Sequence, residues 1–203
     1  MKIQKLIEVM EKLRDPLKGC PWDKKQTLVS IIPHSIEEVY ELADEIYDKN
    51  YDGIKDELGD LLFQVIYLSQ LCKEKNKFDF DDVVESITNK MILRHPHIFQ
   101  NKKFNNKKDF EEWWEKSKNK KLKGLLDNIP KSSPSMLKSN IIQKKVAGVG
   151  FEYTNNIHAI NKIIEEAKEL KKEIKLKNKK KIKEELGDLI FATLDVSRKL
   201  KLD

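Results

Sequence analysis

Glycine, proline and cysteine are scarce in this chain of 203 residues, which contains 7 Gly, 6 Pro and 2 Cys. Folds built from many β-turns use glycine and proline heavily, so their scarcity argues against a β-sandwich or a β-barrel. Two cysteines, Cys20 and Cys72, cannot form a disulfide framework, and they lack the spacing of metal ligands. We therefore expect a cytoplasmic protein with reduced thiols.

Long apolar segments are missing as well. No apolar run approaches the roughly 18 residues of a membrane span, and the first residues carry mixed charge instead of an apolar leader. We therefore expect no membrane partner.

Charged residues are abundant, because 36% of the residues are Asp, Glu, Lys or Arg. So much charge with so few turn-forming residues is typical of long amphipathic helices, and it predicts an all-α fold.

The net charge of +6 raises the question of nucleic-acid binding. The excess lies in residues 101–145, which carry 13 Lys and 5 acidic residues. Only three residues of the chain are Arg, the residue whose planar fork suits the reading of bases. A solvated lysine surface explains the segment better, and we expect no nucleic-acid partner.

Two short acidic motifs occur twice at one spacing. The sequence EEVYEL at 37–42 returns as EEAKEL at 165–170, and ELGDLLF at 57–63 returns as ELGDLIF at 185–191. Both pairs are 128 residues apart, and a single offset for two motifs indicates an internal repeat. The sequence therefore predicts two tandem helical units.

The first copy has the pattern of an antiparallel helical hairpin. Apolar residues recur at helical spacing through 36–47 and through 54–72, with a turn predicted at Asn50–Gly53. Ser35, followed three residues later by Glu38, is the expected N-cap of the first helix. Residues equidistant from the turn lie level in such a hairpin. Position 41 is therefore expected to face position 60, and position 45 to face position 57.

Carboxylates gather on the facing sides of these two helices. Stacked like charges destabilise a helix unless a cation lies between them, and Mg²⁺ takes hard oxygen ligands and bridges to phosphates. A solvated acidic face is the alternative interpretation. The glycines inside both copies, at 59 and 187, predict a close approach of helices beside the acidic residues. The candidate metal ligands are Glu38, Glu41, Glu57 and Asp60.

A third helix follows, with Asp79 or Asp81 as its expected cap and Pro96 ending it near His95. Its Lys90 and Arg94 share one face at i,i+4 spacing. Two cations beside a carboxylate–metal cluster suit triphosphate chemistry, in which cations hold the phosphate oxygens. An ordinary surface pair is the alternative.

Aromatic residues supply candidate contacts to a base. Residues 110–118 predict a short amphipathic helix in which Trp114 and Lys118 are one turn apart. The indole could stack on a base while the ammonium group reaches a phosphate, or the Trp pair could pack in a core. Trp22, in the predicted turn at 20–23, is a further aromatic that we assign to substrate binding.

These motifs, taken in order, resemble the first domain of MazG proteins. They are GCPWD at 19–23 with QT at 26–27, EExxE at 37–41, ELGDLLF at 57–63, and Lys90 with RHPH at 94–97. GLLDNIPK at 124–131 and VGF at 149–151 resemble the linker and the entry to the second domain of that family. We therefore expect an N-terminal domain at 1–118, a linker at 119–135, and a shortened C-terminal domain at 136–203.

The resemblance implies hydrolysis of nucleoside triphosphates to monophosphate and pyrophosphate. It also implies a Mg²⁺ cofactor, with Mn²⁺ as a possible substitute, and a helical bundle completed by homodimerisation. Glu38, Glu41, Glu57 and Asp60 would hold the metal, and Lys90 with Arg94 would stabilise charge on the phosphates. Glu37 would be a fifth carboxylate or the base that orients water.

The two copies are not equivalent in this sequence. A counterpart of Lys90 would fall at position 218, whereas the chain given ends at Asp203. The second copy is therefore expected either to borrow its cations, with Lys162 as one candidate, or to be inactive. We place the working site in the first copy. A non-catalytic helical module that binds nucleotides and dimerises is the alternative from another functional class.

Overall fold

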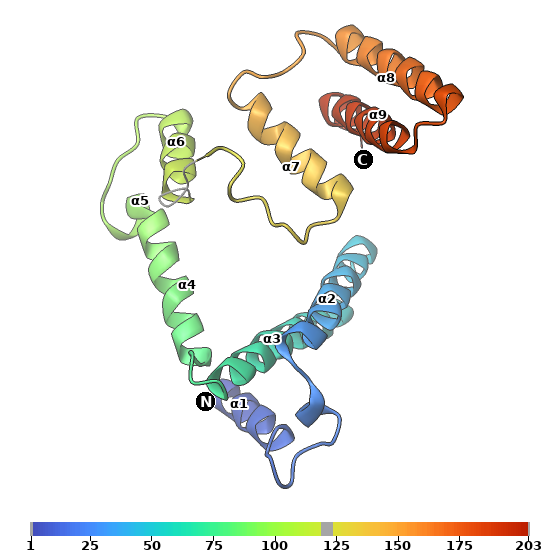
Figure 1. The fold of residues 1–203 in the computed structure, drawn as a ribbon. Coiled ribbons are helices and arrows are strands. Elements are labelled where there is room, and N and C mark those ends of the chain that lie inside the picture. The colour runs from blue at the N-terminus through green and yellow to red at the C-terminus, as the bar shows by residue number, and fades with distance from the viewer. Residues whose placement is uncertain (1, 119–123, 203) are drawn as a thin grey trace. The chain divides into compact units, whose positions relative to one another are not determined.

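The computed structural model describes residues 2–118 and 124–202, which form helices joined by turns and loops (Figure 1). The all-α prediction is confirmed, since the described residues contain no strand. The chain divides into an N-terminal unit, Met1–Asn106, and a C-terminal unit, Lys107–Asp203. Among the described helices, none combines the length and the hydrophobicity that crossing a membrane requires.

The N-terminal unit holds the first five α-helices and one 3-10 turn. They are α1 (Lys2–Leu13), the 3-10 turn (Asp23–Lys25), α2 (Leu28–Asp48), α3 (Tyr51–Lys73), α4 (Phe80–Arg94) and α5 (Pro96–Phe99). The C-terminal unit holds α6 (Lys107–Lys118), α7 (Ser135–Ala147), α8 (Asn156–Leu176) and α9 (Lys179–Leu200). Helix α6 thus groups with the C-terminal unit, and the domain bounds expected above remain a prediction. Part of the predicted linker, 119–123, lies outside the described residues.

The hairpin of α2 and α3 begins earlier than the sequence suggested. Thr27, and not Ser35, caps α2 in a reciprocal capping box with Ser30. Ser35 lies inside the helix, where its Oγ donates to the Ile31 carbonyl oxygen at 3.2 Å. The predicted start was wrong because the Ser35–Glu38 spacing imitates a capping box inside a helix that already begins at Leu28 and that accommodates Pro33 in its second turn.

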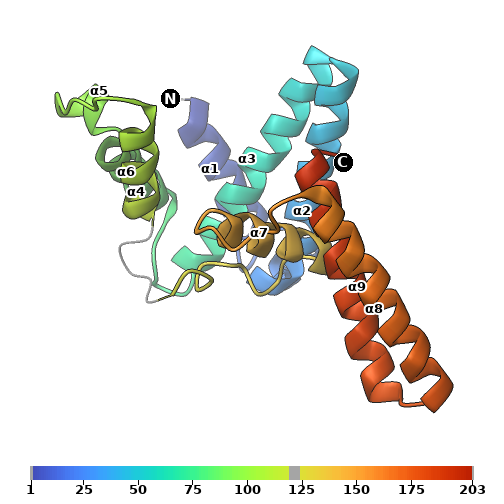
Figure 2. The same cartoon turned by 90° about the horizontal axis from the view of Figure 1, so that it is seen from above.

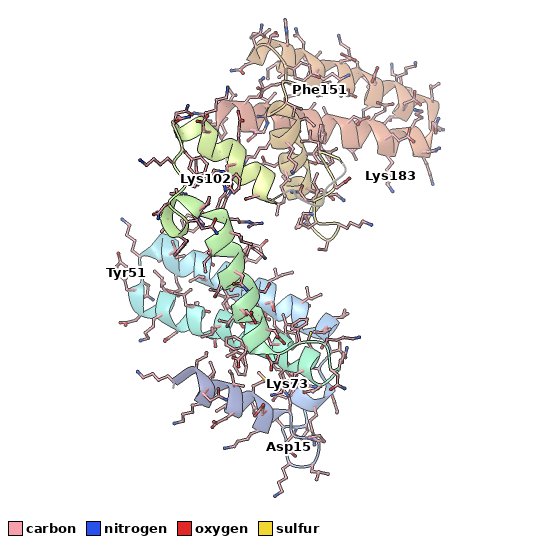
Figure 3. All side chains as sticks on the ribbon, turned by 90° about the vertical axis from the view of Figure 1, so that its left-hand side faces the viewer. Asp15, Tyr51, Lys73, Lys102, Phe151 and Lys183 are labelled. Atoms are coloured by element: carbon pink, nitrogen blue, oxygen red, sulfur yellow. The ribbon has the colours of Figure 1, made fainter. Side chains whose placement is uncertain are left out.

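The turn of this hairpin is very short. Lys49 ends α2 in the left-handed region, at φ 57°, and Asn50 caps α3 by accepting from the Gly53 N–H at 3.3 Å. A Cβ placed on Gly53 would lie 2.1 Å from Glu45 Oε2. A side chain at 53 would therefore push the Glu45 carboxylate away from the turn. Figure 3 labels Tyr51 at this end of α3 and Lys73 at the other.

The N-terminal unit has a small core at the end of the hairpin remote from the turn. Its buried members come from three helices and are Met10, Ile31, Ile66, Tyr67 and Leu71. Helix α1, which was not predicted, contributes Met10, with no exposed surface. Its apolar residues at 3, 6, 7 and 10 follow the helical spacing that would have revealed it.

The C-terminal hairpin matches the N-terminal one position by position. Helices α2 and α8 start 128 residues apart, and so do α3 and α9. Lys177 again ends the first helix in the left-handed region, at φ 56°, and Asn178 again caps the second. Figure 2 shows α8 and α9 side by side. Helix α7 packs on α9, where Gln143 Nε2 donates to the Phe191 carbonyl oxygen at 2.7 Å.

The glycines at 59 and 187 do not mediate helix contact. A Cβ at Gly59 or at Gly187 would meet no atom within 4 Å. The expected close approach of helices was therefore wrong, because both glycines face open space. The helix starting near Asp79 was predicted correctly: the Asp79 side chain accepts from the N–H groups of Asp81 and Asp82, and α4 ends at Arg94 before His95 and Pro96.

Candidate metal centre

Three carboxylates from α2 and α3 converge in the N-terminal unit. Glu38, Glu57 and Asp60 each offer an oxygen, and these oxygens all lie within 4.8 Å of one another. The i,i+3 spacing of Glu57 and Asp60 puts both on one side of α3, and the short turn brings Glu38 of α2 level with them. We refer to these three residues as the N-terminal acidic group.

Glu57 is the centre of the repulsion in this group. Desolvation raises the pKa of the Glu57 carboxyl, and the charges of Glu41, Asp60, Glu38 and Glu45 raise it further, in that order. Its Oε2 is buried and has no hydrogen-bond partner among the described residues. The two helices therefore shield a carboxylate oxygen from solvent, and no described residue donates a hydrogen bond to it.

The donor set of this group fits a divalent cation. Carboxylate oxygens are the ligands that Mg²⁺ and Mn²⁺ prefer. A bound cation would neutralise the negative charge on the buried Glu57 oxygen. Within the described part of the chain, no Lys or Arg forms an ion pair with any of the three carboxylates. Gln64 Nε2 donates to Glu38 Oε1 at 3.2 Å and so restricts how that carboxylate can turn.

Glu37 and Glu41 lie outside the three-residue group. Glu41 is near enough for its charge to act on Glu57. The Glu37 carboxylate lies 3.8 Å from His34 Nδ1 and is largely exposed. The His34 ring makes an edge contact with Trp22 at 5.7 Å between centroids. Trp22 therefore lies beside the stretch of α2 that carries the acidic residues.

The predicted basic pair lies outside the N-terminal acidic group, and the predicted helix of Trp114 belongs to the C-terminal unit. Lys90 lines a hollow of about 580 Å³ whose other lining residues all lie between 78 and 87, outside the N-terminal acidic group. Arg94 ends the same helix, which leads away from the hairpin in Figure 1. Trp114 packs against Phe110 on α6, at 6.0 Å between centroids, within the C-terminal unit. The side chain of Lys118 lies outside the described part of the structure.

The C-terminal unit holds the counterpart of the acidic group. Glu166, Glu185 and Asp188 offer oxygens within 4.8 Å of one another, each 128 residues after its N-terminal equivalent. Glu165, Glu166 and Glu169 form an overlapping set. Desolvation, followed by the charge of Glu169, raises the pKa of the Glu185 carboxyl.

A lysine makes the second group different from the first. Lys162 Nζ lies 2.6 Å from Glu166 Oε1 and 2.7 Å from Glu165 Oε1. The hydrogen bonds to both carboxylates raise the pKa of Lys162, so it stays charged. Its equivalent 128 residues earlier is His34. The lysine named from the sequence as a source of charge is thus in contact with the second group.

A cavity of about 390 Å³ adjoins the second acidic group. Its wall combines aromatic and charged side chains, among them Phe151, Tyr153, Phe191, Lys162, Glu166 and Asp188. From the sequence, no site role was expected for α7 or for the loop before α8, although VGF at 149–151 in that loop resembles the entry to a second domain. Figure 3 labels Phe151 in that loop.

Comparison with known proteins identifies relatives over nearly the whole chain. Residues 26–99 and 155–202 match the model of the MazG nucleotide pyrophosphohydrolase domain. The nucleoside triphosphate pyrophosphohydrolase of Escherichia coli strain K12 is 39% identical over 206 residues, which cover 98% of this chain and 78% of that protein. A protein of Thermotoga maritima named nucleoside triphosphate pyrophosphohydrolase/pyrophosphatase MazG is 38% identical over 200 residues, covering 98% of this chain and 77% of that protein.

The repulsion at Glu57 predicts a stability effect that depends on metal and pH. Because the carboxyl pKa is raised in the folded state, ionised Glu57 destabilises the fold, and this loss disappears as pH falls through the raised pKa. Glu57→Gln should therefore melt at a higher temperature than the wild type in EDTA at neutral pH, with the difference shrinking in acid. Added Mg²⁺ should raise the melting temperature of the wild type more than that of the variant.

Asp56→Asn is the matched control for this melt. Asp56 is the neighbouring residue on α3, exposed and outside the acidic group, with its carboxylate 3.8 Å from Lys55 Nζ. Its substitution should change neither the EDTA melt nor the response to Mg²⁺. A Glu57→Gln variant that melts below the wild type in EDTA would contradict the repulsion argument.

Proposed function

The chain belongs to the MazG family of nucleotide pyrophosphohydrolases, and we propose that its N-terminal unit carries a Mg²⁺-dependent active site. The reaction is hydrolysis of a nucleoside triphosphate, in which water adds to a phosphorus and a P–O bond breaks, giving nucleoside monophosphate and pyrophosphate. The observation that supports this location is the N-terminal acidic group, in which the buried Glu57 Oε2 has no hydrogen-bond partner among the residues that the structure describes.

Each predicted site residue has a proposed role. Glu38, Glu41, Glu57 and Asp60 would hold Mg²⁺, for which Mn²⁺ can substitute. The bound ion would supply the positive charge that lets a polyphosphate approach an acidic surface. Lys90 and Arg94 would bind phosphate oxygens, and Trp22, Trp114 and Lys118 would bind the rest of the nucleotide.

Glu37 is suited to orienting a water molecule. Its carboxylate is exposed and lies 3.8 Å from His34, so one side stays open to solvent while the imidazole restricts the other. A carboxylate in hydrogen-bond reach of a bound water can accept its proton in the transition state. The other role, a fifth metal ligand, would require Glu37 to turn toward the N-terminal acidic group.

The difference between the two acidic groups favours the N-terminal one as the metal-dependent site. In the C-terminal group Lys162 already neutralises part of the carboxylate charge. In the N-terminal group the equivalent residue is His34, which lies beside Glu37 and outside the three-residue group. A group without an internal cation gains more from binding a divalent ion.

We also propose a homodimer formed through the helical hairpins. The core of the N-terminal unit is small, while large apolar side chains of the α2–α3 hairpin stay exposed; they include Val29, Ile36, Tyr40, Tyr47 and Leu58. Exposed apolar surface of this extent is typical of an interaction site, and a two-fold interface would cover the same face on both copies.

The activity test is pyrophosphate release from a panel of ribo- and deoxyribonucleoside triphosphates. Release should need Mg²⁺ or Mn²⁺ and should stop in EDTA, because clustered carboxylates repel a polyanion unless a cation lies between them. Full turnover in metal-free buffer would refute the carboxylate assignment. Tight nucleotide binding without turnover would favour the non-catalytic module.

Equivalent carboxylates of the two units provide a matched test of location. Glu41→Gln or Asp60→Asn should reduce kcat/KM by about 10²–10³, the cost of losing one group that stabilises the transition state. Glu169→Gln or Asp188→Asn, the same changes 128 residues later, should leave most of the activity. These changes are nearly isosteric, so circular-dichroism melts can show that folding is intact. The reverse pattern would move the active site to the C-terminal unit.

The dimer is tested by mass in solution. Light scattering at micromolar concentration should give twice the chain mass of 23.9 kDa. Ile36→Lys, on the exposed face of α2, should lower that mass because it buries an unpaired charge in the interface. Ile98→Lys, at an exposed apolar position on α5, should not. A monomeric wild type would overturn the proposal.

A further inference from the structure

The loop between α1 and α2 is held by one arginine at the end of α1. The Arg14 guanidinium donates to both carboxylate oxygens of Glu74, with Nε–Oε1 at 2.6 Å and Nη2–Oε2 at 2.7 Å. Its remaining Nη1 donates to the Asp23 carbonyl oxygen in the loop. A planar fork that binds a carboxylate in two places while a third nitrogen reaches the loop is a geometry that only Arg provides.

The surroundings of Arg14 make this arrangement rigid. Its side chain is only 7% exposed and lies over the Tyr67 ring at 5.6 Å. The Tyr67 hydroxyl donates to the same Asp23 oxygen at 3.0 Å, and burial raises the pKa of Tyr67 to about 12. The hydrogen bond from Arg14 lowers the pKa of Glu74, so the pair stays ionised. Figure 3 shows Asp15 and Lys73, the neighbours of this pair, at the same end of the unit.

The loop that Arg14 anchors carries Trp22 on its surface. Trp22 is 52% exposed, and its ring contacts the His34 ring on α2, whose Nδ1 lies 3.8 Å from Glu37 Oε2. The start of the loop is also tight, since a Cβ on Gly19 would lie 2.5 Å from the Leu13 carbonyl oxygen. An exposed aromatic on a fixed loop beside the acidic residues is a preformed surface for a flat ligand.

The C-terminal unit anchors its equivalent loop with a different arginine. Arg198, near the end of α9, lies 2.5 Å from Glu152 Oε1 and 2.8 Å from Asp195 Oδ1. Lys199 Nζ donates to the Tyr153 carbonyl oxygen at 2.6 Å. The anchored segment, 150–153, lies 128 residues after 22–25 and carries Phe151 and Tyr153 of the cavity wall. Both units therefore tie the loop before the hairpin to the end of its second helix.

We propose that Arg14 and Glu74 are positioning residues for nucleotide binding, because they hold the loop 19–26 so that Trp22 stays beside the carboxylates of α2. This inference rests on the proposed function. A ring that is already fixed loses little conformational freedom when a base stacks on it, whereas a mobile loop would have to be ordered at a cost in affinity. Neither residue touches the nucleotide in this proposal.

A second ion pair separates positioning from simple stabilisation. Lys73 Nζ lies 2.7 Å from Glu11 Oε1, and this pair also joins α1 to α3, whereas Arg14 additionally donates to a loop carbonyl oxygen. Glu11→Gln is therefore the control for Arg14→Gln. Glu74→Gln is the milder variant of the arginine's own pair, since it removes the charge and keeps the side-chain shape.

Two measurements on the full chain test the proposal. Hydrogen exchange of the backbone amides, measured without nucleotide, reports how often the loop opens. Calorimetric titration with a non-hydrolysable triphosphate and Mg²⁺ gives the Kd, and steady-state kinetics give KM and kcat. Arg14→Gln and Glu74→Gln should speed exchange in 19–26 and raise Kd and KM roughly three- to tenfold, the cost of ordering one or two side chains. The kcat value should change less than about twofold, because the groups that act on the phosphates are untouched. Arg14→Lys should resemble Arg14→Gln, since it lacks the fork.

The results separate the possible roles. In a Trp22→Ala background, Arg14→Gln should add no further rise in Kd, because both changes remove one contact. Equal effects of Glu11→Gln and Arg14→Gln on Kd would overturn the proposal, as would faster loop exchange with an unchanged Kd.

A rise in Kd for Arg198→Gln alone would assign positioning to the C-terminal loop instead. A wild type that binds the triphosphate without turnover would refute the proposed function and leave this test valid, whereas a wild type that does not bind would refute both.

Discussion

Repulsion between carboxylates that face one another across a helical hairpin is the constraint on which this structure depends. A two-residue turn at Lys49 and Asn50 holds α2 and α3 level, so Glu38 meets Glu57 and Asp60 within 4.8 Å. The hairpin is stable with this arrangement because its core lies at the other end, around Met10 and Tyr67. The acidic end is thereby left available for a cation.

The two hairpins differ in how far the chain itself offsets this repulsion. In the C-terminal unit Lys162 contacts two of the carboxylates directly. In the N-terminal unit the equivalent position is His34, and no residue in the described part of the chain donates to Glu57 Oε2. Two hairpins whose helices start 128 residues apart therefore differ in charge balance: one acidic group contacts a lysine, and the other is the group for which we propose a metal ion. A single side chain accounts for much of this difference.

Anchored loops connect the core to the acidic end. Arg14 joins Glu74 at the end of α3 to the Asp23 carbonyl, next to Trp22, and Arg198 joins α9 to Glu152 in the matching loop. The arginines come from different helices, so the common feature is the anchoring and not the residue that performs it. Each loop thus takes its position from the packed end of its own hairpin.

Local pattern in the sequence was enough to predict the all-α fold, the hairpin and the Asp79 cap, because helical spacing and a short turn decide those features. The pairing expected across the hairpin set position 41 against 60 and position 45 against 57, whereas the structure groups Glu38 with Glu57 and Asp60. The metal, the dimer and the roles of Lys90, Arg94 and Trp114 stay predictions. Ser35 and Gly59 were misjudged because a cap and a close contact depend on where the helix starts and which way it faces. Only the tertiary structure decided three further features: the loop anchored by Arg14, the part of α7 that lines the cavity, and the position of His34 outside the acidic group. In each of them, residues distant in sequence meet through packing that no local pattern encodes.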